Sequence, residues 1–240
     1  MKISILIAFL ESYGAVARQV RHFNKMNLPN DIEFIFVDDG SDPPHNRNDY
    51  ELKNLTLLHT NDKRPWTQGL ARNMGAKIAK GEYLFATDID HIISREAIKD
   101  VYHFSGDRMN FRRFFGVLLE DGSLSQEPKV LEEYGMDMNR LRRSRGLYAS
   151  VHENTYAIKK TLFDELGGYD LKYCLTGRPQ GGDESNFRIK WNQLAAERGL
   201  NPGVFGSNIY MFPVGRFHRD YDLNPKGLFH HLYDDFKRPR

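Results

Sequence analysis

Short apolar runs alternate with helical patterns along the first hundred residues. Buried strands are predicted over the apolar runs 2–9, 32–37, 55–59 and 83–87. Helices are predicted over 13–26, over 67–80 with Thr67 as N-cap and Gly81 as stop, and over 94–104 with Ser94 as N-cap. Strands that alternate with helices pair in parallel. The pattern therefore predicts an α/β, Rossmann-like fold, with a mostly parallel central sheet and helices on both faces.

The second half of the chain is less regular. Strands are predicted over 114–119, 154–158 and 203–214, and the charged stretch 120–150 reads as a long loop near the site. A helix is predicted from the apolar stripe Phe187, Trp191, Leu194 and Ala195, which ends at Gly199. We interpret residues 1–240 as a single domain, with a nucleotide-binding half over 1–92 and an acceptor-binding, catalytic half over 93–240.

Composition narrows the class of protein. The 240 residues are 40% hydrophobic, which favours a globular fold. The single cysteine, Cys174, excludes a disulfide framework and a cysteine-based zinc cluster. No apolar run approaches the roughly 18 residues that a membrane span needs, and we interpret the apolar N-terminus as a strand and not as a signal peptide. These features predict a cytoplasmic protein. The net charge of +2 is too balanced to indicate a polyanionic partner.

Acidic residues follow three of the predicted strands. These residues are Glu11, Asp38, Asp39, Asp88 and Asp90. Ligands of open α/β sheets bind at the carboxyl ends of the strands, so we expect these carboxylates to converge in one crevice.

Asp88-x-Asp90 is the strongest candidate metal site. The chain has neither a GxGxxG after its first strand nor a P-loop, so a bound nucleotide would need another counter-charge for its phosphates. Two aspartates at i and i+2 suit Mg²⁺ or Mn²⁺. The alternative is ordinary turn chemistry at a strand end.

Two further motifs are ambiguous when taken alone. Asp38-Asp39-Gly40-Ser41 is either a simple turn or a carboxylate site that recognises a base or a ribose. Arg72, within the segment GLARNMG, is either a solvated helical arginine or a guanidinium that binds phosphate or base.

An acidic pair precedes the last predicted helix. Asp183 and Glu184 follow Gly181-Gly182, which suits a helix N-terminus and also a general base at the floor of a pocket. His218 is either a metal ligand or a structural histidine.

The order of these motifs resembles the GT-A glycosyltransferases, and more narrowly the bacterial and phage members of glycosyltransferase family two. The segments VDDGS and GLARNMG carry this resemblance, while GGDE and RFHRD are similar to the β-1,4-galactosyltransferase group. The resemblance covers residues 3–92 and about 153–225.

The resemblance implies a role for each matching residue. The donor nucleotide would be bound by Phe9, Glu11, Asp38, Asp39, Arg72 and Asp88. The metal ion, Mn²⁺ or Mg²⁺, would be held by Asp90 and His218, with Asp88 beside it. Glu184 would be the catalytic base, with Asp183 as the other candidate.

The chain departs from the family pattern at three places. Ala8 stands where many relatives have proline, and Glu184 stands where the second acid is normally Asp. The tryptophan that often precedes the glycine pair is absent. The choice between Glu184 and Asp183 as base therefore stays open at this stage.

The sequence thus predicts an inverting, metal-dependent glycosyltransferase, a hexosyl- or pentosyltransferase that uses a nucleotide-sugar donor, UDP-linked by resemblance. The acceptor hydroxyl could belong to a glycan, a lipid-linked sugar or a modified nucleic-acid base. Arg142 and Arg143 are weak candidates for contacting an anionic acceptor.

A stripe of Leu228, Leu232 and Phe236 suits either core packing or peripheral membrane contact. The competing classes are a nucleotidyltransferase and a non-catalytic binding module. The donor sugar, acceptor, linkage and oligomeric state are not encoded in any motif.

Overall fold

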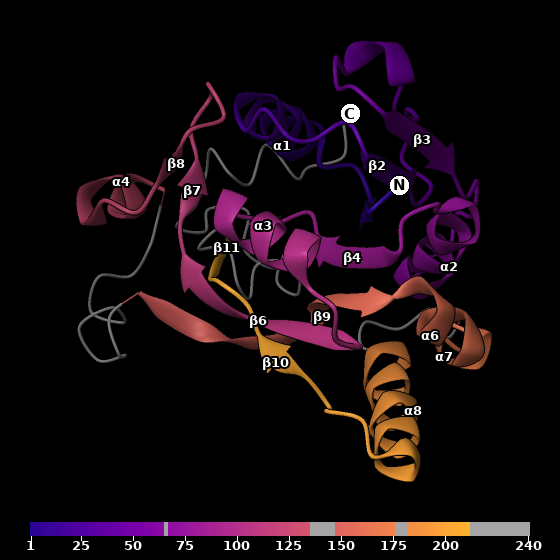
Figure 1. Cartoon of the computed structure of the whole chain (residues 1–240). Coiled ribbons are helices and arrows are strands. Elements are labelled where there is room, and N and C mark those ends of the chain that lie inside the picture. The colour runs from indigo at the N-terminus through magenta and orange to yellow at the C-terminus, as the bar shows by residue number, and fades with distance from the viewer. Residues whose placement is uncertain (65–66, 135–146, 176–181, 212–240) are drawn as a thin grey trace.

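The computed structural model describes residues 1–64, 67–134, 147–175 and 182–211. A curled sheet runs through the described chain in the order β3-β2-β1-β4-β9-β6-β11-β5, with β10 paired to β6 (Figure 1). Its strands are β1 (Ile3–Phe9), β2 (Ile32–Asp38), β3 (Leu55–His59), β4 (Tyr83–Asp88), β5 (His91–Ile92), β6 (Arg108–Phe115), β9 (Tyr148–Lys159), β10 (Val204–Phe205) and β11 (Ile209–Met211). A separate hairpin pairs β7 (Val117–Leu118) with β8 (Leu124–Ser125).

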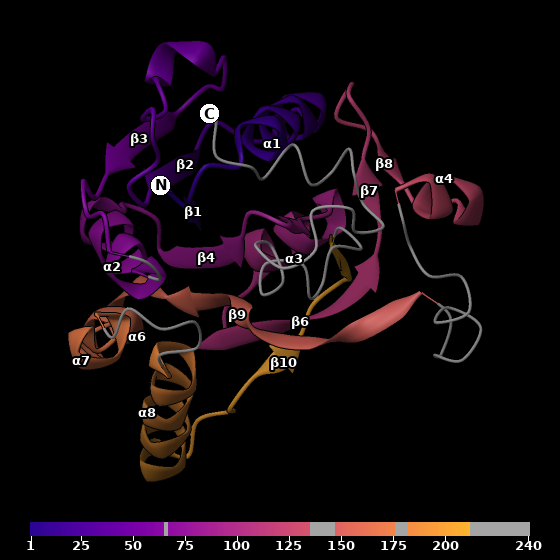
Figure 2. The same cartoon turned by 180° about the vertical axis from the view of Figure 1, so that it is seen from behind.

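Helices cover both faces of this sheet, as predicted (Figures 1 and 2). They are α1 (Tyr13–Lys25), α2 (Gln68–Ile78), α3 (Arg95–His103), α4 (Pro128–Glu133), α6 (Lys160–Glu165), α7 (Leu171–Cys174) and α8 (Asp183–Arg198), with one 3₁₀ turn, η1 (Arg47–Asp49). The fold is a mixed α/β single domain. β3, β2, β1 and β4 pair in parallel, whereas β9 pairs antiparallel with both β4 and β6.

Alternation along each central strand divides the core into two layers. On β1, Ile3, Ile5 and Ile7 pack with α1 and α3, while Leu6 and Ala8 pack with α2 and the helices of the second half. Successive side chains of a strand point to opposite faces, so a strand that is apolar at every position is buried on both sides.

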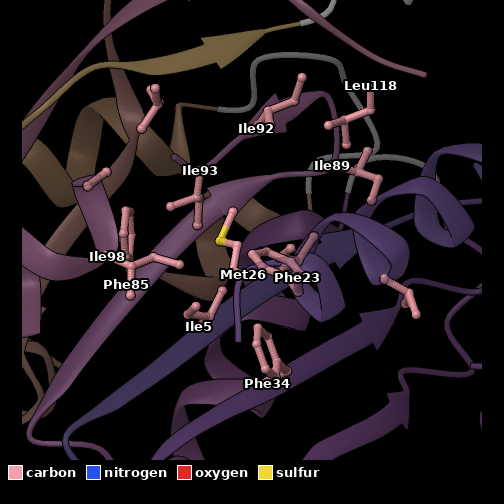
Figure 3. Packing of buried hydrophobic residues seen from close by; sticks show 14 of the residues in the cluster. Ile5, Phe23, Met26, Phe34, Phe85, Ile89, Ile92, Ile93, Ile98 and Leu118 are labelled. Carbon is pink, nitrogen blue, oxygen red and sulfur yellow. The ribbon is translucent and has the colours of Figure 1, made fainter. Parts of the chain in front are cut away.

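Figure 3 shows how the first layer is built. Phe23 of α1 and Met26, which directly follows this helix, lie over Ile5, Phe34 and Phe85, which come from three neighbouring strands. The rings of Phe23 and Phe34 lie 4.7 Å apart between centroids. This packing anchors α1 and therefore positions the loop between β1 and α1, where Glu11 lies.

The sheet curls back on itself at Asp88. β4 ends at Asp88 and β5 begins at His91, yet β5 lies at the far end of the strand order, paired with β11. Three residues span at most about 11 Å. The two strands are therefore close in space, and the sheet between them must bend round.

The predicted element boundaries need three corrections. Helix α2 ends at Ile78, and Gly81 lies beyond it, where a Cβ would come within 2.4 Å of the Ser4 backbone nitrogen. The predicted strand 114–119 is two strands, β6 and β7, interrupted at Gly116, and β6 begins at Arg108. Within the predicted strand 203–214 the described residues form two short strands, β10 and β11.

Two further corrections concern residues 120–159: the stretch 120–150, predicted as a loop, contains β8 and α4, and the predicted strand 154–158 is the C-terminal part of the longer β9. Two of the predicted helix ends are confirmed. Ser94 caps α3 by accepting a hydrogen bond from the Ala97 amide, and α8 ends at Gly199 with φ 63°. Across the described parts of the chain, no helix is both long enough and apolar enough to span a bilayer. The Leu228, Leu232 and Phe236 stripe lies outside the described residues.

Candidate active site

The carboxyl ends of β1 and β2 are joined by direct hydrogen bonds. The Asp39 amide donates to the Phe9 carbonyl at 2.7 Å, and the Glu11 amide donates to Ser41 Oγ at the same distance. Glu11 adopts φ 56° and is buried. The sequence therefore places these acidic residues correctly at one edge of the sheet.

Asp38 and Asp39 occupy different environments although they are neighbours. Asp38 accepts hydrogen bonds from the Ser41 and His45 amides and from His59. Although burial opposes ionisation, the donors of Ser41 and His45 hold the pKa of Asp38 below the usual value. Asp38 thus stabilises the turn that follows β2.

Two threonine hydroxyl groups bind the carboxylate of Asp39. Its Oδ1 accepts hydrogen bonds from Thr67 Oγ1 at 2.7 Å and from Thr60 Oγ1 at 3.2 Å. Burial outweighs these bonds and raises the pKa of Asp39 to about 6. The sequence predicts Thr67 as a helix cap, but its hydroxyl forms no cap and binds this carboxylate instead.

Aromatic side chains lie beside this turn. Phe9 is buried and packs edge-on against Phe36 and His45. Tyr13 stacks on His45, with ring centroids 4.1 Å apart and planes 5° apart. His45 is held by the Glu11 carbonyl at 2.6 Å. No sequence motif predicts the Tyr13–His45 stack.

Asp88 is held by side chains from two elements. Its Oδ1 accepts hydrogen bonds from Gln68 at 2.9 Å and from Arg72, which also forms an ion pair with it. Gln68 and Arg72 are one turn apart on α2 and so present their donors on the same side. Asp88 Oδ2 lies 3.4 Å from Asn154 Nδ2 of β9.

Glu184 joins this cluster from the first turn of α8. Its Oε1 accepts a hydrogen bond from Asn154 and lies 3.7 Å from Arg72 Nη1. Burial, with help from the charges of Asp88 and Asp183, raises the pKa of Glu184 to about 7, against the opposing effect of Arg72. Its side chain remains about one-third exposed, at 34%. A carboxylate with this pKa can accept a proton near neutral pH.

Asp183 points elsewhere. A Cβ at Gly69 would lie 2.6 Å from Asp183 Oδ2 and 2.4 Å from Cys174 Sγ, so the glycine lets these two groups approach the start of α2. Gly182 precedes the acidic pair with φ 90°, a conformation that glycine adopts readily. Thus Glu184 shares the partners Arg72 and Asn154 with Asp88, whereas Asp183 lies beside Gly69.

Asp88, Asp90 and His91 form a group whose ligand atoms all lie within 4.8 Å of one another, which suits a cation. However, Arg113 Nη1 lies 2.7 Å from His91 Nε2, and Thr155 Oγ1 lies 2.6 Å from His91 Nδ1. Because arginine can only donate, we assign the proton of His91 to Nδ1. Both ring nitrogens are then engaged, so the two carboxylates fit a divalent cation better than His91 does.

A chain of buried polar groups links four strands of the sheet. The Thr87 and Thr155 hydroxyls lie 3.1 Å apart, and His91 and Arg113 continue the chain. These residues come from β4, β9, β5 and β6. They fix the position of the Asp88–Asp90 turn relative to the second half of the chain.

Some predicted site residues cannot be placed. His218, Arg142 and Arg143 lie outside the described residues, and their roles stay predictions. No motif in the sequence singles out Gln68 or Asn154. A polar residue at the start of the predicted strand 154–158 is the only signal for Asn154.

Comparison with known proteins agrees with the arrangement of the first half. Residues 4–110 match the family described as "Glycosyl transferase family 2". The matched segment includes the Asp39 turn, Arg72 and the Asp88–Asp90 pair, but it ends before Asn154 and Glu184.

Curated relatives with matching segments are bacterial. The chain is 31% identical over 106 residues to "Glycosyltransferase GlyG" of Streptococcus pneumoniae, covering 42% of this chain and 34% of the relative. It is 26% identical over 141 residues to "Poly(ribitol-phosphate) beta-N-acetylglucosaminyltransferase TarP" of Staphylococcus aureus, covering 56% and 42%. It is 32% identical over 117 residues to "Poly(ribitol-phosphate) beta-glucosyltransferase" of Bacillus spizizenii, covering 46% and 18%. The matches thus span less than half the length of each relative.

Solved structures agree with the fold. The S. aureus TarS 1–349 structure superposes with a TM-score of 0.50 at 16% identity, covering 98% of this chain and 70% of TarS 1–349. Glucosyl-3-phosphoglycerate synthase from Mycobacterium tuberculosis also has a TM-score of 0.50, at 14% identity, and covers 88% and 70%. The fold is therefore the GT-A type that the sequence predicts.

Proposed function

We propose that this chain, whose residues 4–110 match glycosyltransferase family 2, is an inverting glycosyltransferase that uses a nucleotide-sugar donor, UDP-linked, and a divalent cation. One observation carries the proposal. The cluster of Arg72, Asp88, Asn154 and Glu184 joins the family-matched half of the chain to a carboxylate of the second half with a raised pKa. Perturbed carboxylates gathered at the carboxyl edge of an α/β sheet are typical of catalytic sites.

The charge at this edge supports a cation. Asp38, Asp39, Asp88 and Asp90 lie at the ends of β2 and β4, while Arg72 is already paired with Asp88. A diphosphate would be repelled by these carboxylates unless a cation offsets the charge. Asp90 and Asp88 Oδ2 would hold the ion, and a bound divalent cation would offset the charge that builds on the departing diphosphate. The late histidine His218 remains the proposed further ligand.

The residues of the chain then have distinct tasks. Asp39, ionised, accepts a hydrogen bond from an N–H of the donor base. Glu184 accepts the proton of the acceptor hydroxyl as that oxygen bonds to the anomeric carbon and the carbon–phosphate oxygen bond breaks. Attack from the face opposite the diphosphate inverts the configuration, as a single displacement with a positioned base requires. The two poly(ribitol-phosphate) transferases among the relatives support an acceptor with sugar or polyol hydroxyls. No finding favours a lipid-linked sugar or a nucleic-acid base.

Binding and turnover of sugar nucleotides test this proposal. Thermal unfolding is measured with UDP-, GDP- and CDP-sugars, with and without Mn²⁺, and release of the nucleotide is followed with a ribitol-phosphate polymer as acceptor. We expect stabilisation by UDP-sugars that needs Mn²⁺. Asp90→Ala should abolish turnover and weaken Mn²⁺-dependent binding of UDP.

A matched variant controls for loss of a surface aspartate. Asp164 lies on α6 with its side chain 55% exposed and pairs only with Lys160 among the described residues. Asp164→Ala should behave as the wild type does. Full activity in excess EDTA, or normal UDP binding by Asp90→Ala, would contradict the metal-dependent mechanism.

A further inference from the structure

We propose that Asn154 is a positioning residue that orients Glu184 for proton transfer by tying it to Asp88; this inference rests on the proposed function. Asn154 is buried on β9, and it lies outside the family-matched segment. Its amide group donates to Glu184 Oε1, and its Nδ2 lies 3.4 Å from Asp88 Oδ2.

The register of the sheet determines where Asn154 lies. β4 and β9 are antiparallel, with Leu84 opposite Ile158 and Ala86 opposite Tyr156. Continuing that register brings Thr155 opposite Thr87, and their hydroxyls are indeed 3.1 Å apart. The next pair is Asn154 opposite Asp88. The backbone therefore holds the amide beside the end of β4.

The chemistry of an amide suits this position. Asp88 and Glu184 carry like charges, so they repel each other when both are ionised. Asn154 offers two N–H donors without adding charge, and it can therefore bridge the two carboxylates. Arg72 and Gln68 engage Oδ1 of Asp88, which leaves Oδ2 on the side of Asn154.

Glu184 needs such a constraint. It lies in the first turn of α8 and is about one-third exposed, so its side chain could otherwise turn into solvent. Immobilising a glutamate costs conformational entropy, and the partly buried hydrogen bond from Asn154 opposes that loss. With Oε1 held by Asn154, Oε2 is the oxygen that takes the acceptor proton.

A double-mutant cycle tests this role. Turnover is measured for the wild type, Asn154→Ala, Glu184→Gln and the double variant, with the UDP-sugar that gives the largest stabilisation in the thermal-unfolding experiment. We expect Asn154→Ala to lower kcat about tenfold or more and to leave the donor KM and the Kd of UDP within threefold of the wild type. In the Glu184→Gln background the same change should cost less than a further twofold, because Asn154 acts through Glu184.

Two variants separate positioning from structural support. Asn154→Asp keeps the shape of the side chain but removes its N–H donors, so it should lower kcat at least as much as Asn154→Ala. Asn73 is a structural counterpart on α2: its amide holds the Tyr169 backbone through hydrogen bonds of 2.7 and 2.9 Å. Asn73→Ala should lower the melting temperature, and any loss of kcat should be the same in both backgrounds.

The outcomes distinguish this inference from the proposed function. Equal losses from Asn154→Ala in both backgrounds, or a raised Kd of UDP with unchanged kcat, would overturn the positioning role while Glu184 remains the base. Full activity of Glu184→Gln would overturn the assignment of the base, and the role of Asn154 with it. A wild-type protein that turns over no sugar nucleotide would overturn both.

Discussion

At the scale of single residues, burial sets the chemistry of the carboxylates. Asp38, which accepts hydrogen bonds from the Ser41 and His45 amides, has a lowered pKa, whereas Asp39 beside it has a pKa raised to about 6 by burial. The pKa of Glu184 is raised further, to about 7. The same type of side chain can thus hold a turn, accept a hydrogen bond or accept a proton, depending on its donors and its exposure to water.

The pKa of Glu184 predicts a pH dependence of turnover. This pKa is raised above the ordinary value of 4.5, so the ionised fraction of the group grows as the pH rises through about 7. We expect kcat to rise with pH up to that point and then to level. Glu184→Gln should lower kcat by a factor of about 10²–10⁴. Its remaining kcat should no longer rise with pH below 7, and it should still bind the UDP-sugar.

Asp183→Asn is the matched comparison, because Asp183 is adjacent but lies toward Gly69. Asp183→Asn should lose less activity than Glu184→Gln, and its kcat should still rise with pH up to about 7. If Asp183→Asn is inactive and Glu184→Gln is active, the roles of the two acids are reversed.

At the scale of elements, the turns at the carboxyl edge determine which side chains meet. Gly40 has φ 91° and follows β2, and a Cβ at this position would lie 2.1 Å from the Asp62 carbonyl oxygen. The turn after β2 therefore packs backbone to backbone against the segment after β3, which carries Thr60. That close approach brings the Thr60 hydroxyl to Asp39.

Gly40→Ala should therefore weaken donor binding. The added Cβ would clash with backbone atoms of Asp62. In addition, holding an alanine in the left-handed backbone conformation costs about 1–3 kcal/mol. We expect a lower melting temperature and a higher Kd of UDP. Gly167→Ala is the control, since Gly167 also has a positive φ, 71°, but a Cβ there would meet no heavy atom within 4 Å. Equal Kd values for the two variants would show that the turn does not shape the donor site.

At the scale of the whole molecule, the curl of the sheet brings the two halves of the chain together. Thr87, Thr155, His91 and Arg113 join four strands in one buried polar chain. Burial holds the pKa of His91 below its usual value, which keeps the ring neutral and able to accept from Arg113. The position of the Asp88–Asp90 turn therefore depends on the closure of the sheet.

His91→Ala should destabilise the fold more than it weakens metal binding. It removes a buried hydrogen-bond partner from Arg113 and from Thr155, which costs about 1–3 kcal/mol and lowers the melting temperature. The Mn²⁺ concentration for half-maximal binding of UDP should change less than threefold, whereas Asp90→Ala should raise it at least tenfold. A tenfold rise for His91→Ala would instead make His91 a metal ligand.

Much of the first half follows from sequence pattern. The predicted bounds of β1, β2, β3 and β4 agree with the structure within a residue or two. Three of these strands, β1, β2 and β4, are buried on both faces and are therefore apolar at nearly every position. The placement of Glu11, Asp39 and Asp88 at one edge of the sheet is predictable because parallel strands end at the same edge. The second half is less predictable. β6 carries three arginines, of which Arg108 and Arg113 are buried, so its apolar signal is broken.

The sequence by itself determined the alternation of strands and helices in the first hundred residues, the helices on both faces of the sheet and the acidic edge, since these depend on periodicities of neighbouring residues. Only the tertiary structure decided that Asn154 lies opposite Asp88, that Glu184 and not Asp183 joins this cluster, and that His91 is engaged by Arg113. These contacts join residues 22 to 66 positions apart in the chain. Such pairs meet through strand register and sheet curvature, which arise from the packing of the whole chain and leave no local pattern to read.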